Sequence, residues 1–253
     1  MNYVNLMRPI VQKAGDLVMF NFRQNITITY KKDKSIVTNV DLLCEEFLKT
    51  ELLAALPGSG FIAEESKQSN VHKFTWVIDP IDGTKNFVRG IPYFCINVAL
   101  MQEQEIIAAV TYQPVLDEWF YAQKGCGAFL NSTRLQLQQS WKSAGALIVV
   151  SDYLLRKVDD LNQIKQVCKS IEQGVRFRVN GAVALDLAYA ASGMFDVVIF
   201  QNLACWDMVA GILLIQEAGG MVCEHDGAPI TWHSKSLIAG DEQLCKLVMS
   251  VLK

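Results

Sequence analysis

The sequence predicts a mixed α/β fold in which layers of helix and sheet alternate. Three observations support it: two helical patterns open the chain, a β-rich segment follows, and strands then alternate with helices. Of the 253 residues, 51% are hydrophobic and 19% are charged, so the chain can bury a large core. We expect a half spanning 1–140 and a half spanning 141–253, packed tightly as one unit.

Two helices are predicted near the N-terminus. Apolar residues at 3,4 spacing indicate that the first helix is amphipathic: Val4, Met7, Val11, Ala14 and Val18. A polar connection, residues 25–34, leads to a second helix that begins at Thr38 and runs toward Leu56. The apolar face of this helix is expected to carry Leu43, Phe47 and Leu52. Thr38 and Asp41 resemble a capping box, so a structural and a chemical role for Asp41 are both open here.

Runs of β-branched and aromatic residues predict the strands of the first half, at 61–63, 74–78, 94–101, 106–112 and 118–121. The strand at 74–78 is expected to stop at Pro80, because proline has no N–H to give to a ladder. In the second half we expect strands at 146–151, 175–178 and 195–200. Helices are expected to alternate with them, at 158–171, 182–191 and 205–218.

The most informative stretch of the chain is 76–87. A short buried strand there leads into a tight turn with two carboxylates three residues apart, Asp79 and Asp82, followed by Gly83 and Thr84. Hard divalent cations such as Mg²⁺ prefer carboxylate oxygens, and backbone N–H groups in a turn bind phosphate. An ordinary turn is the structural alternative for either Asp-Pro or Asp-Gly alone. The full string favours a metal and phosphate site.

Further carboxylates stand where they could complete such a site. Glu64 directly follows one predicted strand, and the next strand carries Asp79 and Asp82, so neighbouring strand ends would bring the three together. Adjacent glutamates such as Glu64 and Glu65 are otherwise usually solvated. Asp207 lies in the first turn of an apolar helix. The helix dipole favours a carboxylate there in any case, but a ligand at that position would also be held rigidly.

Charge and cysteine content disfavour several classes of function. The formal net charge is −3, and the short cluster of Lys31, Lys32 and Lys34 is typical of a solvated loop, which disfavours nucleic-acid binding. The N-terminus lacks a signal-peptide pattern, and no apolar run reaches the roughly 18 residues of a membrane span. Seven scattered cysteines suit free thiols in a reducing cytoplasm.

Together these motifs resemble the inositol monophosphatase family of Mg²⁺-dependent, lithium-sensitive sugar-phosphate phosphatases. The resemblance covers nearly the whole chain. It rests on the Thr-Asp pair before the second helix, Ala63-Glu64-Glu65-Ser66, the 79–84 signature, Trp206-Asp207 before Ala210-Gly211, and Gly219-Gly220. It implies a layered α–β–α–β–α sandwich of the inositol monophosphatase and fructose-1,6-bisphosphatase type. It also implies a hydrolase that acts by metal-activated attack of water, and a homodimer.

The resemblance further implies a set of metal ligands, most of them in the N-terminal half. Glu64, Asp79 and the carbonyl of Ile81 would hold a first Mg²⁺. Asp79, Asp82 and Asp207 would hold a second, with two or three ions per site. Such a cluster would neutralise the charge of a phosphate monoester and lower the pKa of bound water.

Other motif residues are implied to act on water and substrate. Thr84, paired with Asp41, would orient the attacking water near Glu64, so these three residues are the implied catalytic group. The backbone of Gly83 and Thr84 would hold phosphate oxygens. The implied substrate-binding residues are Asp82, Gly83, Thr84, Arg178 and Asp207.

Two departures from the family pattern leave the substrate open. Phe200 stands where many inositol-specific members carry a glutamate, with Gln201 next to it as a weak substitute. Lys85 resembles members that act on 3′-phosphoadenosine 5′-phosphate or histidinol phosphate. Inositol 1-phosphate or a related small monoester is therefore the first expectation, and those two esters or fructose 1,6-bisphosphate are the alternatives. A hypothesis of another class is a binding or regulatory partner with little turnover.

Overall fold

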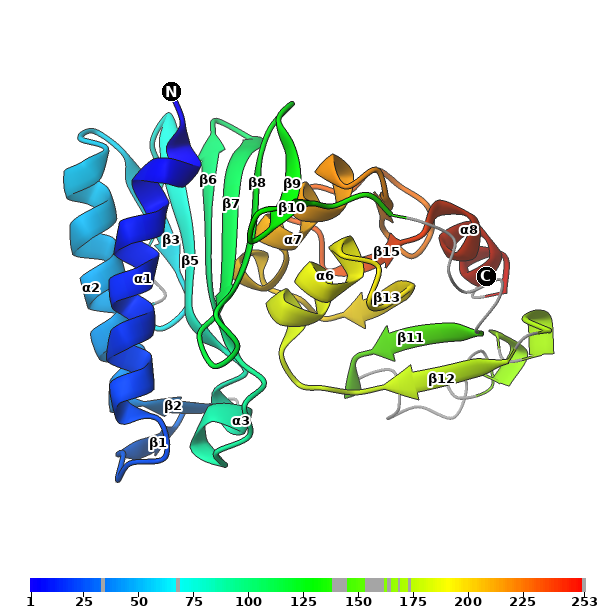
Figure 1. Cartoon of the computed structure of the whole chain (residues 1–253), viewed down its shortest axis with the longest axis horizontal. Coiled ribbons are helices and arrows are strands. Elements are labelled where there is room, and N and C mark those ends of the chain that lie inside the picture. Colours follow the sequence, from blue (N-terminus) through cyan, green and yellow to red (C-terminus); the bar gives the residue numbers. More distant parts are fainter. Residues whose placement is uncertain are drawn as a thin grey trace.

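The computed structural model describes residues 1–32, 35–66, 69–137, 145–152, 162, 165–167, 169–172 and 174–251. Its secondary structure forms five layers, seen side by side in Figure 1: a helix pair, a large sheet, a second helix pair, a smaller sheet and a C-terminal helix. This confirms the expected α–β–α–β–α sandwich. Within the described residues, no helix is both long enough and apolar enough to cross a membrane.

The first helical layer consists of α1 (Tyr3–Asn21) and α2 (Asn39–Ala55), which cover one face of the large sheet (Figure 1). The predicted apolar stripe of α1 is buried. On α2 the predicted face is partly wrong, because Leu43 is 55% exposed. The buried row instead contains Val40, Cys44, Leu48 and Leu52. Leu43 stands one position outside this i, i+4 row and therefore faces away from the core.

The large sheet has eight strands in the order β10-β9-β8-β7-β6-β5-β3-β4. Their bounds are β3 Gly60–Ala63, β4 Ser69–Asn70, β5 Phe74–Asp82, β6 Cys95–Gln102, β7 Glu105–Gln113, β8 Glu118–Gln123, β9 Gly127–Leu130 and β10 Thr133–Arg134. All five strands predicted for this half are present. β3 and β5 are parallel neighbours, with Ala63 opposite Ile78, so they end at the same edge of the sheet.

The prediction that Pro80 ends its strand is wrong, because β5 continues to Asp82. Its pairing with β6 shifts register between Asp79, opposite Asn97, and Asp82, opposite Cys95. Asp79 and Asp82 are three residues apart on β5, whereas their partners Asn97 and Cys95 are two residues apart on β6, which is the pattern of a β-bulge. A proline is tolerated in a bulge, where its missing N–H is not needed for pairing. In a regular strand, residues three apart face opposite sides. The extra residue lets both carboxylates serve one site.

A small hairpin occupies part of the stretch that was predicted as a polar connection. It pairs β1 (Ile28–Tyr30) antiparallel with β2 (Ile36–Thr38). The backbone N–H of Lys31 donates to the carbonyl of Ser35 at 2.8 Å, beside the turn. All three residues of β1 are exposed. Residues 26–30 do alternate apolar and polar side chains, Ile-Thr-Ile-Thr-Tyr, so the pattern of a strand was present and was overlooked when the stretch was interpreted as a polar connection.

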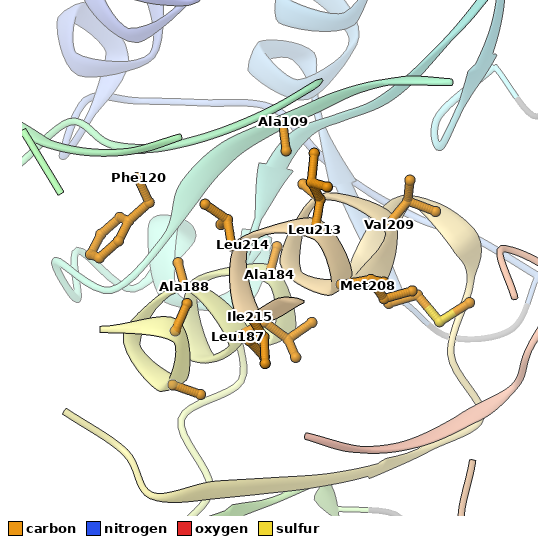
Figure 2. Close-up of a cluster of buried hydrophobic side chains, with 14 of the residues drawn as sticks. Ala109, Phe120, Ala184, Leu187, Ala188, Met208, Val209, Leu213, Leu214 and Ile215 are labelled. Carbon is orange, nitrogen blue, oxygen red and sulfur yellow. The ribbon is translucent and has the colours of Figure 1, made fainter. Parts of the chain in front are cut away.

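The second helical layer, α6 (Val183–Ala191) and α7 (Cys205–Glu217), lies between the two sheets (Figure 1). Both helices have apolar residues around most of their circumference, as expected of a layer buried on two faces. Figure 2 shows Leu213 of α7 beside Ala109 of β7, and Leu187 of α6 in the same cluster. A Cβ on Gly211 would overlap the Leu187 side chain, so this glycine allows the two helices to pack closely.

The small sheet has the order β12-β11-β13-β15-β14 and is covered by α8 (Glu242–Val251). Its strands are β11 Ala146–Val150, β12 Val175–Arg178, β13 Val197–Gln201, β14 Met221–Cys223 and β15 Ser236–Gly240. The three strands predicted here and the helices at 182–191 and 205–218 are confirmed within two residues. Half of the predicted helix at 158–171, and the boundary near 140, lie outside the described residues, so that helix and the division into halves stay predictions.

Candidate active site

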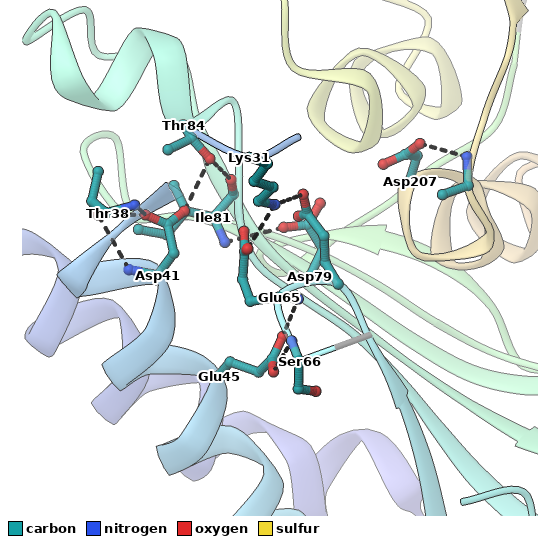
Figure 3. A network of polar contacts seen from close by, with 12 residues as sticks. Lys31, Thr38, Asp41, Glu45, Glu65, Ser66, Asp79, Ile81, Thr84 and Asp207 are labelled. Carbon is teal, nitrogen blue, oxygen red and sulfur yellow. Dashed lines mark hydrogen bonds and ion pairs between the residues drawn. The ribbon is translucent and has the colours of Figure 1, made fainter. Parts of the chain in front are cut away.

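The parallel ends of β3 and β5 bring the first carboxylates of the candidate site together (Figure 3). Glu64 follows β3, and its backbone N–H donates to the carbonyl of Ile78 at 3.3 Å. Asp79 is 2% exposed, and its Oδ1 accepts the N–H of Ile81 at 3.1 Å. Burial, together with the negative charges of Glu64 and other nearby acids, raises the pKa of Asp79 well above its ordinary value.

Asp82 is held by the backbone at the start of α6, about a hundred positions further along the chain. Its Oδ1 accepts the N–H of Val183 and its Oδ2 that of Leu185, each at 3.0 Å. The Cys95 thiol lies 3.6 Å from Oδ2. Burial raises the pKa of Asp82 to about 7 even though these donors act in the opposite direction. The carboxylate is thus fixed in place, and burial disfavours its ionised form.

Asp207 reaches the site from the first turn of α7, across from the β5 end (Figure 3). Its Oδ2 accepts the N–H of Ala204 at 2.8 Å, which closes the helix N-terminus. Asn97 of β6 donates to the carbonyl of Trp206 at 2.8 Å, which ties this turn to the large sheet. Burial and the charges of Asp82 and Glu64 raise the pKa of Asp207 to about 7. The structural and the chemical interpretation of Asp207 are therefore compatible.

Asp41 has the capping role that the sequence left open, and it also contacts Thr84 of the candidate site. The capping box is present, because the N–H and hydroxyl of Thr38 both donate to Asp41 Oδ2. Asp41 is fully buried, and its other oxygen accepts the hydroxyl of Thr84 at 2.9 Å. The carbonyl of Ile81 lies 3.1 Å from the same hydroxyl. Burial raises the pKa of Asp41, while the donors from Thr38 and Thr84 oppose the shift.

The turn after β5 requires glycine at position 83. Gly83 has φ +92°, in the left-handed region, and it precedes the short helix α3 (Thr84–Val88). A Cβ at this position would lie 3.0 Å from both the Ala182 Cβ and the carbonyl oxygen of Tyr93. The turn therefore packs directly against the segment that leads into α6.

Lys31 is a site neighbour that sequence reasoning missed, because its cluster was interpreted as a solvated loop. Its ammonium lies 3.0 Å from Glu64 and 2.6 Å from Glu65, with the lysine side chain only 13% exposed. Glu45 of α2 accepts the N–H groups of Glu65 and Ser66, at 2.6 and 2.9 Å, and so fixes the turn after β3. Lysine beside two glutamates across a hairpin is a long-range pairing, and nothing in the local sequence signals it.

Arg178 is not brought into this group. It is exposed on β12, and within the described residues its guanidinium donates only to the carbonyl of Phe177, at 3.1 Å. Phe200 is buried in β13, and the neighbouring Gln201 side chain lies 3.0 Å from Nδ1 of His225. The role predicted for Arg178 stays a prediction.

The oxygen atoms that the site offers are chemically suited to a hard cation. Carboxylate oxygens and the Ile81 carbonyl are the ligands that Mg²⁺ prefers. Burial is the main cause of the raised pKa values of Asp79, Asp82 and Asp207, and the charges of neighbouring acids add to it; a bound cation would favour the ionised forms. Among the described residues, no three His, Cys, Asp or Glu side chains are already arranged so that they could hold a metal ion. The acids lie close enough for their charges to act on one another, but in the part of the chain that the structure describes they do not form a closed metal cage.

The fold and the site define a layered α–β–α–β–α protein with a buried acidic site where the large sheet meets the N-termini of α6 and α7. Residues 3–253 match the model of the inositol monophosphatase family, and the chain belongs to this family. Family membership supports a phosphatase, a hydrolase of phosphate esters, and the family is generally metal-dependent.

Named relatives extend along the whole chain. An inositol-1-monophosphatase of Rhizobium meliloti (strain 1021) is 34% identical, over 99% of this chain and 96% of its own length. A Nus factor SuhB of Xylella fastidiosa is 32% identical, over 98% and 94%. Among solved structures, extragenic suppressor protein suhB from Bartonella henselae has a TM-score of 0.90 at 32% identity, covering 100% of this chain and 99% of its own.

Proposed function

We propose that this protein is a Mg²⁺-dependent phosphatase that hydrolyses inositol 1-phosphate or a related small phosphate monoester. The observation that carries the proposal is that four acids from distant parts of the chain lie close enough for their charges to act on one another: Glu64, Asp79, Asp82 and Asp207. A stable fold gains nothing from gathering like charges in a buried place, because burial and the neighbouring acids raise the pKa of Asp79 and of Asp207. A site that binds cations explains the arrangement.

Each acid has a distinct part in the proposed site. Glu64, Asp79 and the carbonyl of Ile81 would hold one Mg²⁺, and Asp79, Asp82 and Asp207 a second, with Asp79 shared. When bound, the ions would neutralise phosphate charge and lower the pKa of water. The bonds that Asp82 and Asp207 accept from backbone N–H groups leave each carboxylate with capacity for a ligand.

Thr84 is proposed to orient the attacking water. Its hydroxyl proton is directed to the buried Asp41 carboxylate or to the Ile81 carbonyl, so its oxygen remains an acceptor for a proton of water. The N–H groups of Gly83 and Thr84 would hold phosphate oxygens. Positioning and electrostatics of this kind are sufficient for phosphoryl transfer without a covalent nucleophile.

The substrate is the less determined part of the proposal. Inositol 1-phosphate is favoured because the 34% identical relative carries the name inositol-1-monophosphatase. Phe200 is buried and offers no polar group to a sugar hydroxyl, and Lys85 is exposed beside the turn. These two positions keep 3′-phosphoadenosine 5′-phosphate, fructose 1,6-bisphosphate and histidinol phosphate as alternatives. Lithium sensitivity, a homodimer and a cytoplasmic location belong to the proposal as expectations from the family resemblance.

A panel of phosphate esters tests the proposal. Phosphate release would be measured for each ester with Mg²⁺, with Mg²⁺ plus Li⁺, and with chelator alone. We expect turnover that needs Mg²⁺, falls with Li⁺, and has its highest kcat/KM on an inositol monophosphate. A higher kcat/KM on another ester would reassign the substrate within the same chemistry. Absence of turnover on every ester would reject the enzyme and favour a binding or regulatory partner.

A further inference from the structure

Asp82 owes its orientation to backbone donors, so whatever fixes those donors also fixes Asp82. The N–H groups of Val183 and Leu185 hold its two oxygens at 3.0 Å each. We propose that Asp186, Tyr93 and Asn180 form a positioning unit that fixes this backbone and thereby sets the affinity of the site for its cation. The inference rests on the proposed function for the identity of Asp82 as a ligand.

The three side chains are joined to one another by hydrogen bonds that meet at Asp186 Oδ1 and the Tyr93 hydroxyl. Asp186, in the first turn of α6, is 1% exposed. Its Oδ1 accepts the hydroxyl of Tyr93 at 2.5 Å and the side-chain amide of Asn180 at 2.7 Å. The same amide lies 3.3 Å from the Tyr93 hydroxyl, which can accept its second proton. A buried carboxylate with two such donors is held in one position.

Asn86 of α3 fastens this unit to the turn that follows β5. Its side-chain amide donates to the carbonyl of Tyr93 at 2.8 Å and to the carbonyl of Asn180 at 2.9 Å. The loop before β6 and the loop before α6 are therefore tied to one helix, which begins directly after Gly83. Contacts thus run without a break from the proposed phosphate turn to the donors of Asp82.

The electrostatics give the unit its importance for metal binding. Asp82 is buried close to other acids, and Asp186 itself contributes to raising the pKa of Asp82. Without firm donors, a carboxylate so close to other negative charges would turn away from the site. Groups that orient a ligand from behind typically change metal affinity by about 10- to 100-fold when they are removed. A purely structural role would change stability and leave metal affinity alone.

Four variants of the full chain separate these roles. Tyr93→Phe removes one donor to Asp186, and Asp186→Ala removes the acceptor. Asp186→Asn keeps an Oδ1 that can accept both bonds, so it is the conservative rescue. Tyr189→Phe is the matched control. Tyr189 lies on α6 like Asp186, and the centre of its ring is 5.9 Å from that of Tyr93. Its hydroxyl donates to Glu118 at 2.6 Å and not to Asp186.

Binding of Mn²⁺ alone, followed by electron paramagnetic resonance, gives a readout that does not need turnover. We expect Tyr93→Phe and Asp186→Ala to weaken Mn²⁺ binding by about tenfold, and Asp186→Asn and Tyr189→Phe to stay within about threefold of the wild type. In phosphate release, the Mg²⁺ concentration for half-maximal rate should rise in the first two variants. The kcat at saturating Mg²⁺ should stay close to the wild-type value.

Wild-type Mn²⁺ affinity in both Tyr93→Phe and Asp186→Ala would overturn the inference. So would an Asp186→Asn variant as weak as Asp186→Ala, because charge and not bonding would then be the cause. If Asp186→Ala fails to fold, Tyr93→Phe decides the question alone. A wild-type protein that binds Mn²⁺ but hydrolyses no ester would reject the proposed function, while the comparison of Mn²⁺ affinities would still test the positioning unit.

Discussion

The hydroxyl oxygen of Thr84 lies 2.9 Å from Oδ1 of Asp41, although 43 positions separate the two residues in the chain. Asp41 belongs to the first turn of α2 and Thr84 opens α3, so the bond fastens the first helical layer to the turn after β5. Thr38 also donates to Asp41, which fixes the carboxylate from its other side. The capping box at the N-terminus of α2 thereby also orients a hydroxyl in the candidate site.

Replacing Thr84 with valine keeps the side-chain shape and removes the hydroxyl. If Thr84 orients water, kcat should fall by at least about 100-fold. The lost bond to Asp41 should cost about 1 kcal/mol, which lowers the thermal midpoint by only about 2–4 °C. Thr84→Ser retains the hydroxyl and should keep most of the activity. Equal kcat values for the valine and serine variants would remove Thr84 from the mechanism.

Neutral replacements of two proposed ligands test the metal site directly. Glu64→Gln and Asp207→Asn are each expected to abolish Mg²⁺-dependent phosphate release, because an amide is a much weaker ligand than a carboxylate. Circular dichroism should show both variants folded. Glu242→Gln, which breaks an exposed pair with Lys246 on α8, serves as the control and should behave like the wild type. Activity within a few-fold of normal in both ligand variants would contradict the assignment.

The stability of the metal-free protein should depend on pH in a defined direction. Burial raises the pKa values of Asp82 and Asp207 to about 7 from an ordinary 3.8. A carboxyl whose pKa is raised on folding stabilises the protein below its unfolded pKa, and this contribution is lost as pH rises through the folded value. Metal-free protein should therefore unfold at a lower temperature at about pH 8 than at about pH 5.

Addition of Mg²⁺ should reverse that trend. Protons compete with the cation for the same oxygens below about pH 7, so the rise in thermal midpoint on adding Mg²⁺ should be larger at the higher pH. Differential scanning calorimetry with chelator and with excess Mg²⁺ measures both effects. A Mg²⁺-induced shift of the same size at the two pH values would mean that Asp82 and Asp207 do not bind the ion.

A pair of glycine substitutions separates backbone strain from crowding in the phosphate turn. Gly83→Ala and Gly58→Ala both place a Cβ on a left-handed residue, with φ of +92° and +81°. Strain alone should cost each variant about 1–2 kcal/mol. Only at Gly83 would the new atom also press on Ala182 and the Tyr93 carbonyl, whereas at Gly58 it meets nothing within 4 Å.

We therefore expect Gly83→Ala to lose most phosphate release and Gly58→Ala to retain it. Thermal unfolding and steady-state kinetics of the two variants, compared with wild type, measure both quantities. If Gly83→Ala kept full activity, the backbone of this turn would have no close part in holding phosphate.

Local signals in the sequence predicted most of the elements correctly. The apolar stripe of α1, the capping box of α2 and the strands β3 and β5–β8 depend on neighbours within a few positions, so periodicity and capping reveal them. The exposed strand β1 lies in a stretch that also alternates, residues 26–30, but it was missed because that stretch was interpreted as a polar connection. The extension of β5 beyond Pro80 was also missed, because it depends on the register of β6, which pairs only after folding.

By itself, the sequence determined which residues are proposed to carry the chemistry, because carboxylates at strand ends, a Gly-Thr turn and an acid at a helix N-terminus form a recognisable set. Only the tertiary structure decided how those residues are held. The bulge that aligns Asp79 with Asp82, the α6 backbone that orients Asp82, and the approach of Lys31 to Glu64 all join segments far apart in the chain. Such contacts form when layers pack, and no local pattern encodes them.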